Sequence, residues 1–431
     1  MRIAIVGAGV AGLAAAARLH PEHDITVFEA DAHVGGHALT VPVPDSAVRA
    51  SLGLPAANAR AAVVHQADLG FMVWNTHTYP GLHALFETLG VETEATSMGF
   101  SVRDDATGIE YAGETFDTLF AQRRNLFRPS FHGMIGALIR FNKHARGWVA
   151  GAYAHATLGE LVERERFPAE FRDLYLVPMG AAIWSASERD MVAFPAAFFV
   201  HFLANHGMLE PPSRQFQWRV MRGGSQRYVS ALSAPFADRI RLRTPVHEVR
   251  RTATGVQVAC DGARETFDLA VLALHADQAR AVLGDPSPLE AEALAAFPYR
   301  ENAAVLHTDI GVLPRARRAW ASWNYHVPAD RTAPVSVTYD LSRLQHIATP
   351  SPLLLTLNDS GRVRPAHVLR RQRFAHPAFT RASIAMQARH AEVSGSQRVH
   401  FCGAYWRNGF HEDGYWSGMR VADAIVGNGK P

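Results

Sequence analysis

The chain has few of the residues that stabilise small disulfide-bonded or metal-binding domains. It contains two cysteines in 431 residues, Cys260 and Cys402, which lie far apart in the sequence. This number is too small for a disulfide framework and the spacing fits no cysteine-based metal cluster, so we expect a reducing compartment and no metal. The sequence also shows no internal repeat and no uninterrupted apolar run that could span a membrane. A cytoplasmic location is therefore expected.

Lysine is also scarce, because the sequence contains only Lys143 and Lys430. The formal net charge of +3 is too small to indicate a nucleic-acid partner. A hydrophobic fraction of 48% and a charged fraction of 19% are those of an ordinary folded protein. Because 431 residues exceed the usual size of a single hydrophobic core, two interleaved lobes are expected.

The start of the chain predicts a strand, a glycine turn, a helix and a second strand. The short apolar run Arg2–Val6 is typical of a buried parallel strand, and the alanine-rich run Leu13–Leu19 is a strong helix former. Ile25–Phe28 is the second strand. Glycines and charges interrupt the apolar residues, which argues against a secretory signal. The turn reads G-x-G-x-x-G, with Gly7, Gly9 and Gly12.

This motif is typical of a dinucleotide site. Its first glycine permits a tight turn, its second lets the backbone approach a pyrophosphate, and its third lets the helix pack close to the strand. The N–H groups at the start of the helix, where Ala11 lies, then face the phosphates. Glu29 ends the second strand, and a carboxylate at this distance accepts hydrogen bonds from ribose hydroxyls.

A second glycine pair indicates FAD rather than a nicotinamide cofactor. Gly35 and Gly36 follow Glu29 closely. This arrangement resembles FAD enzymes of the glutathione-reductase-like superfamily, in which the pair lets the chain pass beside the flavin's phosphates. Many members have an arginine after the pair, whereas this chain has His37. The resemblance therefore implies a weaker or pH-dependent charge facing the phosphates.

The next segment carries a more specific resemblance. The patterns D-x-G-F, T-Y-P, L-F-x-x-L-G-V and S-M-x-F-S-V occur between residues 68 and 102. They resemble a bacterial group within the flavin amine oxidase and phytoene desaturase superfamily, described only as predicted NAD/FAD-binding proteins. Members are often encoded beside cyclopropane-fatty-acid-synthase-like methyltransferases. The resemblance implies that Asp68 and Gly70 end a strand returning to the flavin, while a simple turn cap at Asp68 is the alternative.

Local patterns around this segment predict further elements. Residues 41–62, rich in proline, alanine and serine, are expected to form a loop. Helical spacing of leucines precedes Gly90, a plausible helix end, and Phe100 with Val102 indicate a strand.

Residues 118–159 contain no acidic side chain but several basic ones. Phe131, Met134, Leu138 and Phe141 are spaced three or four apart, which predicts one apolar helical face. A core-facing helix with a solvated basic face is the simpler interpretation. A surface in peripheral contact with an anionic membrane is the alternative.

The stretch from residue 175 to residue 209 is dense in apolar and aromatic side chains. It predicts either plain core or the wall of an apolar pocket deep enough for an acyl chain. His201 and His206 lie five residues apart, so on one helix they point to different faces, which is poor spacing for a shared metal.

The C-terminal segment supplies the second strong signal for FAD. A strand ending at Cys402 is followed by Gly403, and Gly414 precedes a predicted helix that contains Ser417. The start of that helix can stabilise negative charge on a reduced flavin. In the superfamily an acidic residue before this helix binds the ribityl chain or phosphate, and Asp413 matches it. The resemblance also places the backbone of Val246 against the adenine.

Together these patterns predict an α/β protein, namely a glutathione-reductase-like FAD-binding Rossmann domain with an interleaved α+β substrate domain. The expected FAD-binding domain comprises residues 1–74, 215–284 and 391–431, and the substrate domain comprises residues 75–214 and 285–390.

The expected activity is that of an FAD-dependent oxidoreductase. Amine oxidases of this superfamily often hold a water near the flavin with a lysine, and Lys143 is the sole internal candidate, which disfavours an ordinary amine oxidase. The polar groups expected near the flavin are His411, Glu412 and Tyr405, as acid, base or mere packing.

The leading hypothesis is dehydrogenation of a fatty-acyl lipid, including desaturation of a methylated acyl chain. An amine or amino-acid oxidase and a flavin- and lipid-binding protein without turnover are the alternatives. The electron acceptor stays open among O2, a quinone and a redox protein.

Overall fold

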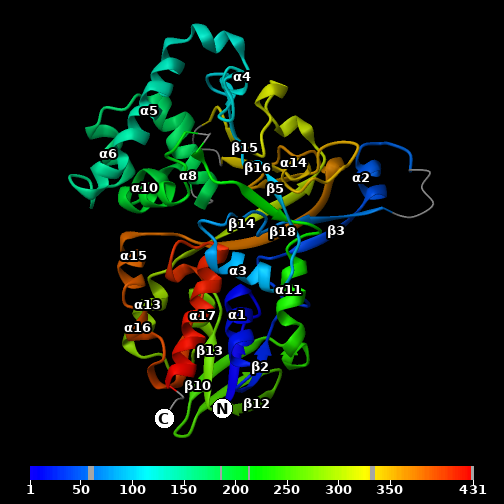
Figure 1. The fold of residues 1–431 in the computed structure, drawn as a ribbon, viewed down its shortest axis with the longest axis vertical. Helices are drawn as coiled ribbons and strands as arrows, with labels where there is room; N and C mark the ends of the chain where they lie inside the picture. The colour runs from blue at the N-terminus through cyan, green and yellow to red at the C-terminus, as the bar shows by residue number, and fades with distance from the viewer. Residues whose placement is uncertain (57–62, 185–186, 212–213, 331–334, 429–431) are drawn as a thin grey trace.

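The computed structural model describes residues 1–56, 63–184, 187–211, 214–330 and 335–428. Figure 1 shows a lower lobe, which contains both termini, and an upper lobe, which contains the long helix α5 (Pro129–Ala150). Within the described ranges, no helix combines the length and the apolar character that crossing a membrane requires.

A parallel sheet forms the centre of the lower lobe. In the described part of the chain its five strands run in the order β19-β13-β1-β2-β9. Along β1 the side chains of Ile3 and Ile5 contact one core, while Ala4 and Val6 contact another. Both faces are therefore covered, as apolar parallel strands require. The strands are β1 (Arg2–Val6), β2 (Asp24–Phe28), β9 (Ile240–Arg241), β13 (Leu269–Leu272) and β19 (Val399–Phe401).

Helices cover one face of this sheet and a three-stranded meander covers the other. Leu13 of α1, Tyr228 of α11 and Val421 of α17 share the first core. Val249 of the meander and Leu294 of α13 share the second core. These three layers confirm the predicted Rossmann-type α/β fold. The elements are α1 (Val10–Leu19), α11 (Gln226–Ser233), α17 (His411–Asn428), β10 (Val246–Arg251), β11 (Val256–Cys260), β12 (Ala263–Phe267), α12 (Ala276–Val282) and α13 (Pro288–Ala295).

The upper lobe is built on a second sheet. Among the described residues it has seven strands in the order β18-β14-β17-β16-β15-β6-β7, antiparallel except for the β15–β6 pair. The strands are β6 (Phe100–Asp104), β7 (Glu110–Ala112), β14 (Tyr299–His307), β15 (Trp323–Val327), β16 (Ser336–Asp340), β17 (Leu354–Leu357) and β18 (Val368–Pro377). Helices α5, α8 (Val177–Trp184) and α10 (Ala196–Asn205) pack with this sheet in the largest core.

The strands of the two main sheets come from separate parts of the chain, and none of them crosses a predicted domain boundary. One smaller pair joins the predicted domains, because β5 (Thr93–Thr96) pairs with β8 (Trp218–Met221). The boundaries themselves stay a prediction.

Two local predictions are confirmed and one is wrong. Helix α3 (Pro80–Thr88) ends just before Gly90, which has a positive φ of +64°, and β6 begins at Phe100. Residues 41–51, however, form β3 (Thr40–Pro44) and α2 (Asp45–Ser51) rather than a loop. The prolines of β3 are tolerated because, among the described residues, this strand pairs only with β4 (Val64–Asp68). Residues 57–62 of that expected loop lie outside the described residues.

Candidate active site

The first glycine motif forms a turn in which the backbone is tightly packed on one side and open on the other. Gly7 has a φ of +101°, and a Cβ added there would lie 2.4 Å from the carbonyl oxygen of Ala273. A Cβ added to Gly12 would lie 1.9 Å from the carbonyl oxygen of Gly7. In the part of the chain that the structure describes, a Cβ added to Gly9 meets nothing within 4 Å, and no side chain caps the start of α1. The free N–H groups of this helix end are thus suited to a phosphate.

The second glycine pair contacts the first motif directly. The N–H of Gly35 donates to the carbonyl oxygen of Ala8 at 2.8 Å. Gly36 has a φ of +56°, and a Cβ added there would lie 3.2 Å from the Cα of Gly9. The two turns therefore form one continuous glycine surface that a side chain at Gly36 would interrupt.

Glu29 is fixed beside these turns by backbone donors. Its Oε2 accepts from the N–H of Ala8 at 2.8 Å, and its Oε1 accepts from the N–H of Asp31 at 2.8 Å. The N–H of Thr244 donates to the backbone carbonyl of Glu29 at 2.8 Å, which brings the start of β10 and Val246 to the same end of the site. The structure thus gathers the predicted ribose and adenine contacts, whose roles remain predictions.

The C-terminal segment lies against the same glycine surface. The N–H of Gly403 donates to Oγ of Ser417 at 3.1 Å. A Cβ added to Gly414 would lie 2.7 Å from Cγ1 of Val10, at the start of α1. Helix α17 already begins at His411, so the prediction that it starts after Gly414 is wrong. The close approach of the two helices explains why small residues are needed there.

Asp413 contacts the backbone at the start of α17 and an arginine. Its Oδ2 accepts from the N–H of Phe410 at 2.9 Å, and Arg407 lies 3.6 Å away as an ion-pair partner. Burial raises the pKa of Asp413 to about 6. The carboxylate therefore caps the first turn of α17, and its predicted role as a ribityl or phosphate ligand is untested.

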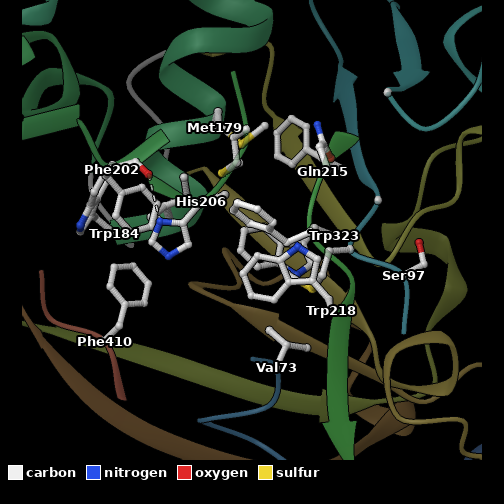
Figure 2. Close-up of a pocket in the computed structure, with 18 of the residues that line it drawn as sticks. Val73, Ser97, Met179, Trp184, Phe202, His206, Gln215, Trp218, Trp323 and Phe410 are labelled. Carbon is white, nitrogen blue, oxygen red and sulfur yellow. Dashed lines mark hydrogen bonds between the residues drawn. The ribbon is translucent and has the colours of Figure 1, made fainter. Parts of the chain in front are cut away.

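A cavity of about 1210 Å³ lies between the two lobes. The lower lobe contributes His37, Gly70, Phe71 and His411, and the upper lobe contributes mainly apolar side chains. Figure 2 shows Trp184, Phe202, His206 and Phe410 on one side and Trp218 and Trp323 on the other. The ring of Phe202 stacks on His206 at 3.8 Å and on Phe410 at 4.9 Å.

Residues 175–209, which were predicted to form either core or the wall of a pocket, contribute to both. Trp184 and Phe202 line the cavity, whereas Phe194 and Phe199 lie in the core. The two predicted histidines separate as the helical spacing implied. His201 is exposed, while His206 is buried, and burial lowers its pKa to about 4.

His411 lines the cavity and its ring is held on two sides. It stacks on Phe71 with ring centroids 3.9 Å apart and an interplanar angle of 10°. Its Nε2 forms a hydrogen bond with the hydroxyl of Tyr228. Burial, reinforced by the nearby His37, lowers the pKa of His411 to about 3. The ring is therefore neutral at neutral pH, and its Nδ1 has a free lone pair in the tautomer in which Nε2–H donates to Tyr228.

Glu412 and Tyr405 are not among the described residues that line the cavity with His411, and their predicted position near the flavin stays a prediction. Oε1 of Glu412 accepts from the N–H of Gly81 at 2.8 Å, and Oε2 accepts from the N–H of Leu82 at 2.9 Å, so the carboxylate caps α3. Consecutive helical residues point about 100° apart, which separates Glu412 from His411. Tyr405 packs edge-on against Phe297 inside a core.

Sequence reasoning missed a group of histidines around His37. The rings of His275 and His376 lie 5.6 and 5.2 Å from that of His37. Burial and then the neighbouring His275 lower the pKa of His37 to about 4, so its ring is neutral at neutral pH, in keeping with the weaker or pH-dependent charge expected after the glycine pair. Nδ1 of His376 accepts from the amide of Asn302 at 2.8 Å. The members come from distant segments, so no local pattern could reveal the group.

Asp68 lies at the end of a strand and its carboxylate binds the start of a helix, while the predicted return of this strand to the flavin stays a prediction. It ends β4, and Gly70 follows so close to His37 that an added Cβ would lie 2.1 Å from the carbonyl oxygen of His37. The carboxylate also accepts from the N–H of Ser225 at 2.9 Å, at the start of α11. Burial raises the pKa of Asp68 to about 6.

Lys143 lies on α5 at the rim of the cavity, exposed to solvent, and not deep beside the glycine surface. Lys430, the other lysine, lies outside the described residues.

Comparisons with known proteins agree with this geometry. The model of the family described as flavin containing amine oxidoreductase matches residues 10–309. AofH of Mycobacterium tuberculosis H37Rv, named as a flavin-containing monoamine oxidase, is 28% identical over 359 residues, covering 79% of this chain and 70% of AofH.

Two solved structures share the fold. Cyclohexylamine oxidase from Brevibacterium oxydans IH-35A superposes with a TM-score of 0.66 at 17% identity, covering 99% of each chain. A fatty acid isomerase from P. acnes that produces CLA superposes with a TM-score of 0.65 at 14% identity, covering 100% of this chain and 99% of its own.

Proposed function

The chain belongs to the flavin-containing amine oxidoreductase family and is an FAD-dependent oxidoreductase, and we propose that its substrate is an apolar lipid, namely a fatty-acyl chain. The glycine surface formed by Gly9 and Gly36, the uncapped start of α1 and the carboxylate of Glu29 would hold the FAD. When bound, FAD supplies a two-electron acceptor for a hydride equivalent from carbon.

The observation that carries the proposal is the cavity between the lobes. Its volume of about 1210 Å³ exceeds the roughly 300–1,000 Å³ of common small-molecule sites. Its wall offers aromatic and aliphatic side chains such as Met179, Trp218 and Trp323. Burying ten methylene groups there would contribute about 8 kcal/mol at roughly 0.8 kcal/mol each. This wall favours a long apolar substrate.

Two carboxylates and two basic side chains carry charge among the lining residues that the structure describes, and Lys143 is the basic one that is open to an anionic end on that substrate. Among the described lining residues the carboxylates are Glu114 and Glu210, and both have partners. Ser97 donates to Glu114 at 2.5 Å, and Arg146 pairs with Glu210 at 2.9 Å. Lys143 at the rim has no hydrogen bond or ion pair to any described residue. Its ammonium is therefore available to a fatty-acid carboxylate or a lipid phosphate.

In this proposal side chains of the protein position the substrate, and one of them accepts a proton from it. Phe71 and Tyr228 hold the ring of His411, and the bond to Tyr228 engages its Nε2. In the tautomer in which Nε2–H donates to the hydroxyl of Tyr228, Nδ1 of the neutral ring is the atom that accepts a proton from the substrate. The aromatic wall excludes water from the reacting carbon.

An anaerobic absorbance titration of the FAD-loaded protein tests the proposal. A long-chain free fatty acid dispersed in detergent should bleach the oxidised flavin band, because the acyl chain supplies the hydride. A panel of primary amines is the comparison. An unchanged band with every acyl substrate would reject the proposal.

One observation favours oxidation of an amine as a second candidate. The stacked rings of Phe202, His206 and Phe410 form an aromatic face on the cavity, and such faces attract cations. Amine oxidases also occur among the relatives in sequence and in fold. Release of hydrogen peroxide with amines, together with flavin bleaching by them alone, would favour this candidate.

A further inference from the structure

Large apolar side chains are exposed on three successive elements of the upper lobe. Phe127, Phe116 and Ile139 are 86%, 72% and 64% exposed, the highest values for large hydrophobic residues in the described part of the chain. Leu126, at 38%, lies beside Phe127. All four belong to α4 (Phe116–Leu119), the 3-10 helix η1 (Arg123–Phe127) and α5. Such clustering is typical of an interaction surface.

Short contacts connect these elements into one surface. Arg123 binds the carboxylate of Asp117, which joins η1 to α4. Nε2 of His132 lies 2.9 Å from the carbonyl oxygen of Leu126, which joins α5 to η1. Figure 1 shows α4 and the start of α5 at the end of the molecule opposite both termini. We call Phe116, Leu126, Phe127, Ile139, Arg124 and Arg128 the tip patch.

The charge of the tip patch is positive and uncompensated. Arg124 donates to the carbonyl oxygen of Gly108 at 2.7 Å, and Arg128 donates to that of Thr107 at 3.4 Å. Neither arginine has a carboxylate partner among the described residues. The sequence also has no acidic residue between 118 and 159. Cationic side chains around exposed aromatic rings match the interface of an anionic bilayer, where the rings enter and the arginines meet phosphates.

The tip patch is continuous with the mouth of the cavity. Leu119, Ile135, Ile139 and Lys143 line the cavity, and Ile139 is also a member of the tip patch. A lipid that leaves a bilayer beneath the patch would therefore meet apolar side chains along its path into the cavity. Lys143 lies on this path, where it can pair with the anionic end of the lipid.

We propose that the tip patch docks on an anionic phospholipid bilayer and that the cavity mouth receives its acyl substrate directly from that bilayer. The route into the cavity rests on the proposed function, whereas docking does not. The described side chains that would enter the interface are those of Phe116 and Phe127, and Arg124 with Arg128 would face the phosphates.

Vesicle flotation of the FAD-loaded protein tests the docking. We expect binding to vesicles of equimolar phosphatidylglycerol and phosphatidylcholine, and at least tenfold weaker binding to pure phosphatidylcholine. The double variant Phe116→Ser/Phe127→Ser should bind the anionic vesicles at least tenfold more weakly than the unmodified protein. Leu54→Ser is the control, because Leu54 is 42% exposed and follows α2, which lies apart from α4 in Figure 1.

The result that would overturn the proposal is equal binding of the double variant and the control, or no binding of the unmodified protein to anionic vesicles. The charge is tested separately with Arg124→Gln/Arg128→Gln, which should remove the preference for phosphatidylglycerol. Unchanged visible absorbance of bound FAD shows that each variant is folded.

Flavin reduction separates this proposal from the proposed function. With detergent-dispersed fatty acid the Phe116→Ser/Phe127→Ser variant should reduce its flavin as fast as the unmodified protein, but with fatty acid in anionic vesicles it should be at least tenfold slower. Equal rates from vesicles would reject delivery through the patch. Failure of every lipid to reduce the flavin of the unmodified protein would reject the proposed function, and the flotation result would still decide the docking.

Discussion

The cofactor end of the site and the cavity present different surfaces, glycine backbone in the first and large side chains in the second. At the cofactor end the surface consists of glycine backbone. A Cβ at Gly12 would clash with a carbonyl oxygen, and the positive φ values of Gly7 and Gly36 disfavour any residue with a side chain. In the cavity the surface consists of large side chains such as Trp218 and Trp323. A substitution at Gly7 or Gly12 therefore acts through steric clash, whereas one in the cavity changes binding or chemistry on an intact fold.

A pair of glycine substitutions should have the largest effects and tests this difference between the two surfaces. Gly12→Ala should prevent accumulation of folded FAD-loaded protein, with a loss of about 3 kcal/mol or more, because the new Cβ would lie 1.9 Å from a carbonyl oxygen. Gly9→Ala should fold, since its Cβ meets no atom within 4 Å, but bind FAD more weakly. The ratio of flavin to protein absorbance after purification measures both. A Gly9→Ala variant with unchanged FAD affinity would exclude phosphate binding at this turn.

A substitution at His411 should instead leave the fold intact and slow the chemistry. His411→Asn is expected to lower the rate of flavin reduction by about 10²- to 10⁴-fold, the usual contribution of a general base. Stopped-flow absorbance gives this rate. The matched control is Glu412→Gln, which alters the cap of α3 and should cost stability with little change in rate. Equal loss of rate in both variants would count against a special role for His411.

A substitution of Lys143 at the rim of the cavity should have a smaller effect, which is confined to substrate binding. Lys143→Gln should raise the half-saturating concentration of a free fatty acid about two- to fivefold, as expected for an exposed ion pair of up to about 1 kcal/mol. Lys143→Arg keeps the charge and should stay close to the unmodified protein. Initial rates against fatty-acid concentration distinguish the two. An unchanged constant for Lys143→Gln would place the anionic end elsewhere.

The histidine group predicts a modest dependence of stability on pH. Burial lowers the pKa of His37 to about 4 and that of His376 to about 3, below the ordinary value of 6.5. The unfolded chain then binds more protons, so stability is full above pH 6.5 and falls as the pH decreases toward these values. The raised pKa values of Asp68 and Asp413 act in the opposite direction, because stability from them increases as the pH falls below 6.

Thermal unfolding between pH 7 and pH 5 measures the balance. Each buried histidine contributes up to about 1.4 kcal/mol per pH unit within its window. His376→Asn should therefore flatten the decline in Tm on acidification. A slope that stays the same in this variant would show that His376 is not the group responsible.

The parts of the site that could be predicted from the sequence are those made by neighbours in the chain. Gly7, Gly9 and Gly12 specify a turn through local geometry alone, and the structure places them as expected. Helix α3 was likewise predictable because its apolar residues and its terminal glycine lie within a few positions of each other.

The parts that could not be predicted depend on tertiary packing or on helix phase. The sequence predicted a weaker or pH-dependent charge at His37, but it could not show that His275 and His376 approach this ring from distant segments and that burial keeps the ring neutral. In the sequence Glu412 and His411 were both candidates for an acid or base near the flavin. In the structure both lie in the first turn of α17, where Glu412 binds the start of α3 and His411 lines the cavity. Exposure of Phe127 has no signature in the sequence, since buried and exposed phenylalanines share the same pattern.

The measurement that tests the central claim most directly is an anaerobic single turnover followed by mass analysis of the products. The FAD-loaded protein is mixed with an equimolar fatty-acyl lipid and an equimolar primary amine in the same reaction. We expect one acyl product, lighter by two hydrogen atoms, for each flavin reduced, with the amine recovered unchanged. Conversion of the amine with an unaltered acyl chain would contradict the account.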